Sequence, residues 1–352
     1  MPGKQHASRR YNRRAILKGA VATTTALATA GFPGLLAAQR RRITVERPLI
    51  AALNGKEGDP TDIAIRLIPK ILREKHNVAL EIDIHASSAL GTDLSQLEAV
   101  QLGQIDITSH TTSQFTTFHS AFAFLDLPYV IPDWDTALRL FGSELWRQQA
   151  AKFEAAVPLK VLPPVGAGGF RLLWNNVRPV PEPAALSGLR IRSSNAALEM
   201  ALLRAWGATP LPLPWVNVEA ALKRRTIDGF HVQPIWTHAF AMYEQLKYAT
   251  AVNALFAVQL QVMNAKTWAA LPEAVQTAFL AAAAEAAAEA NRRDRTAEAG
   301  DTRRLADKGM VIHAPSPAEQ AKWQTAGKGL WQSARGIDRD VLERAAALAK
   351  PA

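Results

Sequence analysis

Two arginines, Arg171 and Arg192, are the residues whose type and placement suggest a chemistry most directly. Both lie near the predicted ends of short strands, Arg171 after a glycine-rich segment and Arg192 at the end of a strand over 189–192. A guanidinium presents a planar fork of donors that matches a carboxylate through two parallel hydrogen bonds. Two such cations facing one cleft would hold a small organic anion. The arginines therefore predict a site that binds a carboxylate and transforms nothing.

The sequence pattern supports a place at the ligand crevice more strongly for Arg192 than for Arg171. Residues two apart on a strand share a face, so Arg190 and Arg192 lie together while Leu189 and Ile191 point to the core. Arg192 is nearer the carboxyl end, where open α/β sheets bind their ligands. Hydrogen bonds to a charged group contribute about 1.5 to 3 kcal/mol each, so two or three suffice for micromolar capture. The alternatives are a surface ion pair for Arg192 and a salt bridge between lobes for Arg171.

The first half of the chain alternates strands with helices. Asp59 and Pro60 are typical of a helix N-cap and first helical position. The predicted elements are strands over 44–53, 78–84 and 105–108 and helices over 59–75 and 91–103. This order favours a mostly parallel sheet covered by helices, with the ligand crevice at the carboxyl ends of the strands. The loops after Leu53, Ile84 and Thr108 are therefore expected to form the wall of the site.

The second half repeats the alternation after a glycine-rich segment over 166–169. We expect this segment to be a hinge, because glycine tolerates unusual torsions and the third glycine of a dinucleotide-binding fingerprint is missing. The strand over 258–263 is predicted to return to the first sheet. A long helix is expected from Ala265 onward, broken only around Gly300. The segment over 317–348 is predicted to be helical and to lie across both lobes.

The N-terminal segment 1–38 is predicted to be an export signal. It contains six lysines and arginines and no acid, followed by an apolar run rich in alanine. Within it, NRRAILK at 12–18 resembles a twin-arginine signal. The alternative is a basic disordered tail. Removal of the segment would lower the net charge from +10 to about +4, so nucleic acid is not an expected partner.

The absence of cysteine excludes disulfides and thiolate metal sites. The body of the chain also lacks the spacing of a zinc protease motif, a nucleophile elbow and a phosphate loop. We therefore expect no metal and no cofactor.

Several short motifs recur in a fixed order along the mature chain. They are ALG at 89–91, AVQLGQID at 99–106, DLPY at 126–129, GFR at 169–171, LSGLRIR at 186–192, WGATP at 206–210, VEAAL at 218–222 and IDG at 227–229. In this order and spacing the chain resembles the substrate-binding proteins of tripartite ATP-independent periplasmic (TRAP) transporters, the DctP-like family.

The resemblance implies an α/β, two-lobed fold of the type II periplasmic-binding-protein class, with a hinge and a long helix bridging the lobes. Lobe I is expected over 43–166 and 257–300, and lobe II over 167–256 and 301–352 with the C-terminal helices. The implied function is capture of a small organic acid in the periplasm by hinge closure and delivery to the membrane subunits of a TRAP transporter. We expect a monomer.

The resemblance also implies site residues. The carboxylate grip matches Arg192, a second arginine matches Arg171, an asparagine matches Asn54, and an aromatic packed against the ligand matches Trp215. Further candidates for the pocket wall are Trp174, Phe230, His231, Gln233 and Trp236, of which about half are expected only to pack.

Two positions depart from the pattern of the family. An asparagine often found after the Asp-Gly pair falls at Val232, and a polar or acidic residue of the third loop falls at Thr111. Hydroxyls of a sugar acid would lack partners at these positions. If several of the further candidates for the wall do line the pocket, we expect the ligand to have an apolar or aromatic body.

Two other functions remain open from the sequence. An exported enzyme is one, because twin-arginine export serves folded, cofactor-bearing enzymes. A ligand sensor that uses the same binding fold is the other.

Overall fold

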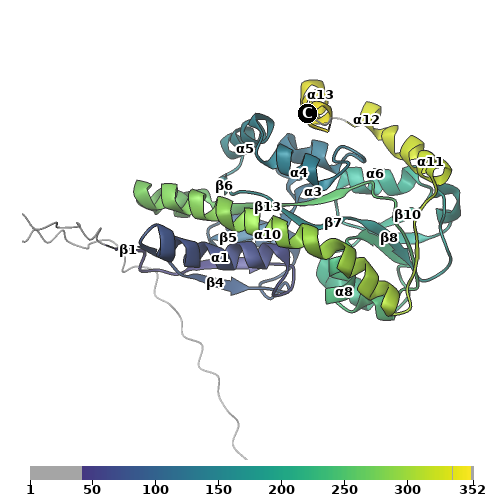
Figure 1. The fold of residues 1–352 in the computed structure, drawn as a ribbon, viewed down its shortest axis with the longest axis horizontal. Coiled ribbons are helices and arrows are strands. Elements are labelled where there is room, and N and C mark those ends of the chain that lie inside the picture. The colour runs from purple at the N-terminus through teal and green to yellow at the C-terminus, as the bar shows by residue number, and fades with distance from the viewer. Residues whose placement is uncertain (1–41, 335, 350–352) are drawn as a thin grey trace, which may run out of the picture. The chain divides into compact units, whose positions relative to one another are not determined.

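The computed structural model describes residues 42–334 and 336–349, which belong to one unit, Arg41–Ala352. The predicted export signal over 1–38 lies outside the described residues. Figure 1 shows a mixed α/β fold with a long helix, α10, and its strands form two six-stranded sheets and one two-stranded sheet. We call the two large sheets, with their covering helices, the first and second lobes. The predicted fold class is confirmed.

The first sheet combines parallel and antiparallel strands. In spatial order it contains β4 (Ile82–His85), β2 (Leu49–Leu53), β5 (Ile107–Thr111), β13 (Phe256–Asn264) and β6 (Leu159–Val161), and β7 (Val165–Phe170) also pairs with β13. Strand β2 is parallel to β4 and β5, whereas β13 is antiparallel to β5, β6 and β7. The strand predicted to return to this sheet does so as β13. Because β13 runs against the other five strands, the sheet is mixed but still mostly parallel in strand direction, as predicted.

The second sheet has the same mixed character. Its order is β10 (Thr209–Pro212), β9 (Arg190–Ser193), β11 (Gly229–Val232), β8 (Leu172–Asn175), β12 (Tyr248–Thr250) and β14 (Val311–His313). Strands β9, β10 and β11 are parallel, and β8 runs antiparallel to β11 and β12. The short strands β1 (Ile43–Thr44) and β3 (Val78–Ala79) pair separately.

The helices begin where local sequence favours it. Asp59 caps α1, and its side chain accepts the amide of Asp62 at 2.8 Å, as the Asp-Pro pair predicts. The remaining α-helices cover the sheets or follow the strands. All bounds are α1 (Pro60–Lys75), α2 (Asp93–Gln101), α3 (Thr112–Phe115), α4 (Trp134–Phe141), α5 (Glu144–Ala156), α6 (Ala197–Ala205), α7 (Val218–Lys223), α8 (Pro234–Ala239), α9 (Ala265–Ala270), α10 (Glu273–Asp307), α11 (Pro317–Lys328), α12 (Leu330–Ser333) and α13 (Arg339–Leu348). Across 42–334 and 336–349, no helix is long and apolar enough to cross a membrane.

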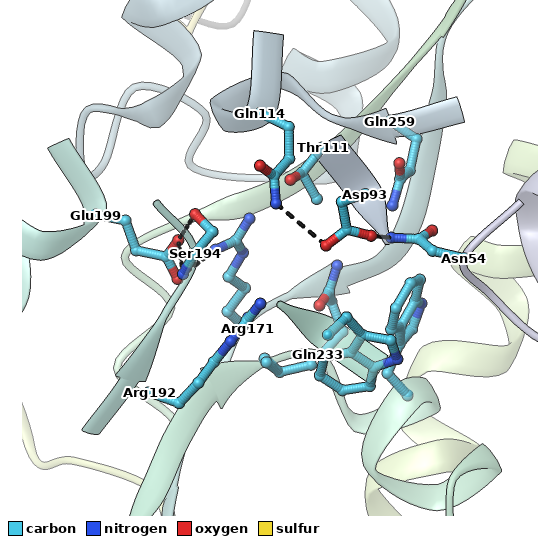
Figure 2. A pocket seen from close by; sticks show the side chains of 13 residues that line it. Asn54, Asp93, Thr111, Gln114, Arg171, Arg192, Ser194, Glu199, Gln233 and Gln259 are labelled. Atoms are coloured by element: carbon cyan, nitrogen blue, oxygen red, sulfur yellow. Dashed lines mark hydrogen bonds and ion pairs between the residues drawn. The ribbon is translucent and has the colours of Figure 1, made fainter. Parts of the chain in front are cut away.

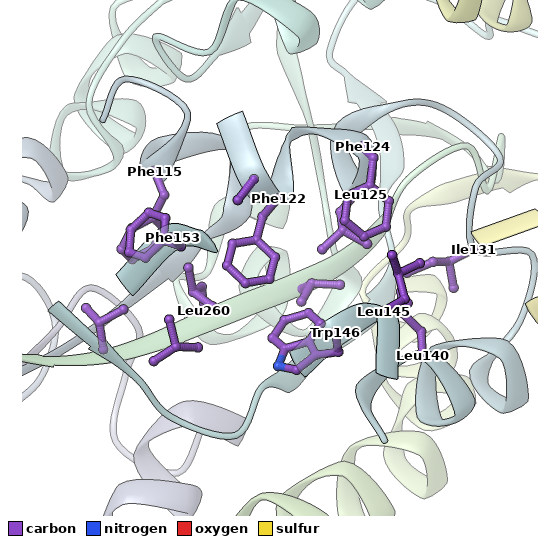
Figure 3. Close-up of a cluster of buried hydrophobic side chains, with 14 of the residues drawn as sticks. Phe115, Phe122, Phe124, Leu125, Ile131, Leu140, Leu145, Trp146, Phe153 and Leu260 are labelled. Carbon is purple, nitrogen blue, oxygen red and sulfur yellow. The ribbon is translucent and has the colours of Figure 1, made fainter. Parts of the chain in front are cut away.

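An aromatic core fills the first lobe on the side of α4 and α5 (Figure 3). The Phe122 and Trp146 rings lie 4.8 Å apart, and Phe115 packs edge-on against Phe153 at 5.8 Å. Helix α13 adds Val341 to this core. Trp331 of α12 and Ile337 also pack against this core.

Helix α11 packs against the second lobe. Its fully buried Trp323 belongs to a core cluster with Trp206 and Leu202. Since α13 packs on α4 and α5 of the first lobe, the C-terminal helices contact both lobes, as predicted. The assignment of 301–352 to the second lobe stays a prediction.

Helix α10 is continuous for 35 residues, so the predicted break at Gly300 is wrong. A glycine inside a helix costs about 1 kcal/mol relative to alanine. Packing of α10 along α1 and β7 outweighs that cost, and Figure 1 shows α10 lying along α1. Its first turn begins after Pro272, not at Ala265, because a separate short helix, α9, precedes it.

Polar side chains of α10 pair with the backbone of β7. Strand β7 bonds to β13 along one edge, and its alternate amides face α10 along the other. The contacts are Gly166 N to Asn291 Oδ1 at 2.7 Å, Gly168 N to Asp294 Oδ2 at 2.8 Å, and Phe170 N to Glu298 Oε1 at 3.0 Å. Positions i, i+3 and i+7 span about 10 Å on one helix face, and four strand residues span about 13 Å. The two spans are similar, so side chains of the helix accept hydrogen bonds from alternate amides along the strand edge.

The glycine-rich segment is therefore an ordered strand and not a loose linker. Gly168 and Gly169 have φ values of +91° and +69°, which side chains rarely adopt, and an added Cβ at Gly168 would lie 2.4 Å from Ile235. The chain passes from the first sheet to the second immediately afterwards, at Arg171. It returns at Leu255, whose carbonyl accepts the Arg171 amide at 3.0 Å. The two crossing segments are thus bonded to each other near the predicted boundaries of the lobes, which stay a prediction.

The carboxyl of Asp294 is buried in this contact. Burial, together with the charges of Glu298, Asp301 and Asp59, raises the pKa of Asp294 to about 7, although the Gly168 amide opposes the shift. The folded state therefore keeps a proton that the unfolded chain releases near pH 4. This contribution to stability is complete below pH 4 and is lost as the pH rises to about 7.

We predict that Asp294→Asn flattens the pH dependence of unfolding. Asparagine still accepts the Gly168 amide but carries no charge, so the variant should gain more stability relative to the wild type at pH 8 than at pH 5. Urea unfolding at both pH values measures the difference. Asp307→Asn, at an exposed position of the same helix, serves as the control. An equal effect of Asp294→Asn at both pH values would contradict the burial of a protonated carboxyl.

Candidate ligand-binding site

A pocket of about 400 Å³, with solvent at its mouth included, lies where the two sheets face each other. Side chains from both lobes line it, and Figure 2 shows them directed toward a common centre. The lining residues are Asn54, Asp93, Thr111, Gln114, Arg171, Arg192, Ser194, Glu199, Trp215, Val232, Gln233, Trp236 and Gln259.

The first lobe contributes the polar side of the pocket. Asn54 follows β2 and Thr111 ends β5, and these neighbouring strands are parallel. Their carboxyl ends therefore meet at one edge, which is where the sequence predicts the crevice. The Thr111 hydroxyl already pairs with Ser113 Oγ at 2.9 Å.

The Arg192 guanidinium is buried without an acidic partner. Only 6% of the residue is exposed, and Nε donates to the Leu213 carbonyl at 2.9 Å. Its guanidinium carbon lies 5.6 Å from the centre of the Trp215 ring. Among residues 42–334 and 336–349, no carboxylate lies within 4 Å of it. Burial lowers the pKa of Arg192, while Glu199 and Asp93 oppose the shift from a greater distance.

The Arg171 guanidinium, in contrast, is paired. Its NH1 group lies 3.2 Å from Glu199 Oε1, and both residues are buried. Burial alone would raise the pKa of Glu199, but Arg171, Arg192 and hydrogen bonds from Ser194 hold it below its usual value. The salt bridge that was the alternative for Arg171 is therefore present, with a partner from α6.

Arg190 shows that the two arginines of β9 differ by their position along the strand, as predicted from the carboxyl-end rule. Its NH2 group lies 2.7 Å from Asp228 Oδ1, and 43% of its side chain is exposed. Asp228 also accepts the backbone amide of Arg190 at 2.8 Å. Arg190 is thus a structural ion pair, whereas Arg192 on the same strand is the unpaired cation of the pocket.

Asp93 is a pocket residue that the sequence did not reveal. Its Oδ1 accepts the Asn54 amide at 2.8 Å, its Oδ2 accepts the Gln114 amide at 3.3 Å, and His110 Nδ1 lies 3.6 Å from Oδ1. Burial alone would raise the pKa of Asp93, but His110, the charge of Arg192 and the Asn54 amide outweigh it and lower the pKa to about 2. Asp93 is therefore a carboxylate at neutral pH.

Aromatic rings form the opposite wall. Trp215 and Trp236 pack at 4.9 Å, and Phe240 packs behind both. Val232 lies on the same wall, as does Gln233. Of the five further candidates named from the sequence, Gln233 and Trp236 thus reach the pocket.

The structure does not bring Trp174, Phe230 or His231 to the pocket wall. Phe230 is fully buried beneath Trp215, and its backbone pairs on both sides within the second sheet. His231 packs against Trp206 at 5.3 Å, and burial together with the charge of Arg171 lowers its pKa to about 3. These side chains support the wall from behind. Their predicted place in the pocket is corrected accordingly.

Sequence reasoning missed Asp93, Gln114, Ser194, Glu199 and Gln259 as lining residues. A signal existed for Asp93, because it follows the N-cap Thr92 at the start of a helix, next to a loop expected at the wall. Whether Glu199 and Gln259 line the pocket depends on which face of a buried element points inward. The sequence alone does not settle that orientation.

The arrangement can hold an anion. Within the described residues, no group of three or more acidic or histidine side chains could hold a metal ion. Arg192 has no acidic partner, whereas Arg171 pairs with Glu199.

A fold of two lobes around a buried cation is that of a solute-binding protein. The family "Bacterial extracellular solute-binding protein, family 7" (DctP) matches residues 51–336. The chain therefore belongs to this family, which confirms the predicted resemblance to TRAP solute-binding proteins.

Individual relatives are distant. The chain is 28% identical over 237 residues to the 2,3-diketo-L-gulonate-binding periplasmic protein YiaO of Escherichia coli, covering 66% of this chain and 71% of that protein. It is 25% identical over 297 residues to the C4-dicarboxylate-binding periplasmic protein DctP of Vibrio cholerae, covering 82% and 86%. A TRAP periplasmic solute-binding protein of Sulfurospirillum deleyianum with bound succinate superposes with a TM-score of 0.80 at 22% identity, covering 88% and 99%. These ligands differ in their number of carboxylates.

We predict that Glu199→Gln destabilises the protein by about 3 to 5 kcal/mol, because it leaves the buried Arg171 without a counter-charge. Urea unfolding at pH 7 measures the change. Glu219→Gln is the control, since Glu219 pairs with Lys223 on the surface, where such pairs contribute less than about 1 kcal/mol. Equal losses in the two variants would show that the Arg171 pair contributes no more than a surface pair.

Proposed function

We propose that this protein captures a small organic carboxylate in the periplasm and delivers it to the membrane subunits of a TRAP transporter. The observation that supports the proposal most strongly is the buried, unpaired guanidinium of Arg192. A ligand carboxylate would supply the missing counter-charge through two parallel hydrogen bonds. Asn54, Thr111, Trp215 and Gln233 would contact the remainder of the ligand.

We propose closure of the two lobes as the mechanism of capture. The pocket wall draws on both sheets, so a ligand bound to one lobe gains contacts from the other and shifts the equilibrium toward the closed state. The bonded crossing segments at Arg171 and Leu255 are the natural place for the hinge. The proposed lobes are 43–166 with 257–300 and 167–256 with 301–352.

The body of the ligand would lie against Trp215, Trp236 and Val232. This wall offers apolar surface, while the Thr111 hydroxyl is engaged with Ser113. A heavily hydroxylated sugar acid would leave several hydroxyls facing apolar atoms. The proposed ligand is therefore largely apolar apart from its carboxylate and a small number of polar groups.

Two other roles of this fold are kept as alternatives. A sensor would use the same liganded state to dock on a different membrane partner. Genes for membrane permease subunits beside this gene favour transport over sensing. Bound flavin or metal in the purified protein would favour an exported enzyme instead of capture without chemical change.

We predict that Arg192→Ala folds normally but binds carboxylates at least about 100-fold more weakly, since it removes two charge-assisted hydrogen bonds. Native mass spectrometry of freshly purified protein identifies a retained ligand, and calorimetry measures its affinity. Arg190→Ala is the matched control, because this arginine shares the strand but pairs with Asp228. Unchanged affinity in Arg192→Ala would refute the role of Arg192.

We further propose export through the twin-arginine pathway, with 1–38 as the signal. Replacing Arg13 and Arg14 together by lysine should abolish export while the charge is kept, because a twin-arginine signal needs both guanidinium groups. Fractionation of cells followed by immunoblotting measures the mature protein in the periplasm. Replacing Arg9 and Arg10 by lysine is the control. Normal export of the Arg13/Arg14 variant would contradict the proposed route.

A further inference from the structure

The charges of the pocket limit how many carboxylates it can hold. This inference rests on the proposed function, since it assumes that the ligand is a carboxylate. The wall contains two guanidiniums, Arg171 and Arg192, and two carboxylates, Asp93 and Glu199. These four charges balance, so each ligand carboxylate adds one negative charge to the buried wall. Lys56 is exposed and lies over Phe240, outside the wall.

The distribution of these charges leaves one place for an anion. Glu199 occupies Arg171 at 3.2 Å, so Arg192 is the cation without a carboxylate in the described part of the wall. A single ligand carboxylate at Arg192 would complete the pairing. A second carboxylate would add a further negative charge that no unpaired cation of the wall matches, which a medium of low dielectric constant strongly disfavours.

The charge of Asp93 disfavours a second carboxylate on the far side of the pocket. Figure 2 shows its carboxylate across the pocket from the Arg192 side chain, between Gln114 and Asn54. An ionised carboxylate only accepts hydrogen bonds, and Asp93 has room for more than the two amides that it now binds. The ligand group that faces it must therefore donate a hydrogen bond.

Gln259 provides an independent indication of the polar group. This residue of β13 is 1% exposed, and within the described part of the chain neither its amide oxygen nor its amide nitrogen has a partner. Figure 2 shows its side chain directed into the pocket on the side of Asp93 and Asn54. A buried amide without partners is costly, and a hydroxyl can both donate to its oxygen and accept from its nitrogen. An ammonium would satisfy Asp93 but could not accept from the Gln259 nitrogen.

We propose that the ligand carries one carboxylate, held by Arg192, and at least one hydroxyl, held by Gln259 and Asp93. The protein would thus select short hydroxy monocarboxylates over dicarboxylates and over unhydroxylated acids. Apolar carbon atoms between the two polar groups would lie on the tryptophan wall.

A matched series of acids tests the inference on the wild-type protein by calorimetry at pH 7. The series contains butyrate, its 2-hydroxy, 3-hydroxy and 4-hydroxy derivatives, 4-aminobutyrate and succinate, together with the corresponding six-carbon acids. At least one hydroxy monocarboxylate should bind ten-fold or more tightly than its parent acid, its amino analogue and the dicarboxylate of equal length.

The other outcomes of the series distinguish failure of this inference from failure of the proposed function. A dicarboxylate, an amino acid or an unhydroxylated acid that binds as tightly as the hydroxy acids overturns the inference but leaves carboxylate capture intact. Failure of every acid to bind overturns the proposed function, and the inference with it.

Variants separate the two polar contacts. Gln259→Leu should reduce the preference for the hydroxy acid over its parent at least five-fold, whereas Gln261→Leu, two residues further along the same strand and outside the pocket wall, should not. Asp93→Asn should improve the affinity for succinate relative to butyrate at least ten-fold. Circular dichroism confirms folding, and unchanged selectivity in folded Asp93→Asn and Gln259→Leu contradicts the assignment of these residues.

Discussion

The structure depends on an imbalance between two buried guanidiniums. Arg171 and Arg192 lie in the same pocket, but Glu199 pairs with the first and leaves the second without a counter-charge. A buried cation without an anion destabilises the empty protein, because desolvation is not compensated. A ligand that provides the anion removes this penalty and stabilises the bound state. Binding and stability are thus coupled at one side chain.

The surrounding fold explains why the imbalance persists. Arg192 is held by the Leu213 carbonyl and the face of Trp215, so it cannot turn away to solvent. Asp93 and Glu199 attract the Arg192 guanidinium only from a distance. Asp93 accepts hydrogen bonds from side-chain amides, and Glu199 pairs with Ser194 and Arg171. The pairing of α10 with β7 supports the crossing of the chain from one sheet to the other at Arg171. The pocket is therefore built on ordered elements.

Local rules located part of this site from the sequence. The strand period distinguished Arg192 from its neighbours, and the crevice rule placed Asn54 and Thr111 at the ends of two strands that prove to be parallel neighbours. Trp215 and Gln233 also reach the wall.

The remaining errors have a physical cause. Strand β11 pairs on both edges and is buried on both faces, so alternation could not tell which side chains face the ligand; Val232 does, whereas His231 does not. The pairing of Glu199 with Arg171 joins residues 28 positions apart through tertiary packing. The continuity of α10 through Gly300 likewise reflects packing against α1 and β7, which overrides local propensity.

A crystal structure of the protein with its retained ligand tests the central claim most directly. We expect both oxygens of the ligand carboxylate to lie about 2.7 to 2.9 Å from the guanidinium nitrogens of Arg192, while Arg171 keeps its contact with Glu199. A ligand that places no anionic group on Arg192, or that displaces Glu199 to bind Arg171 instead, would contradict it.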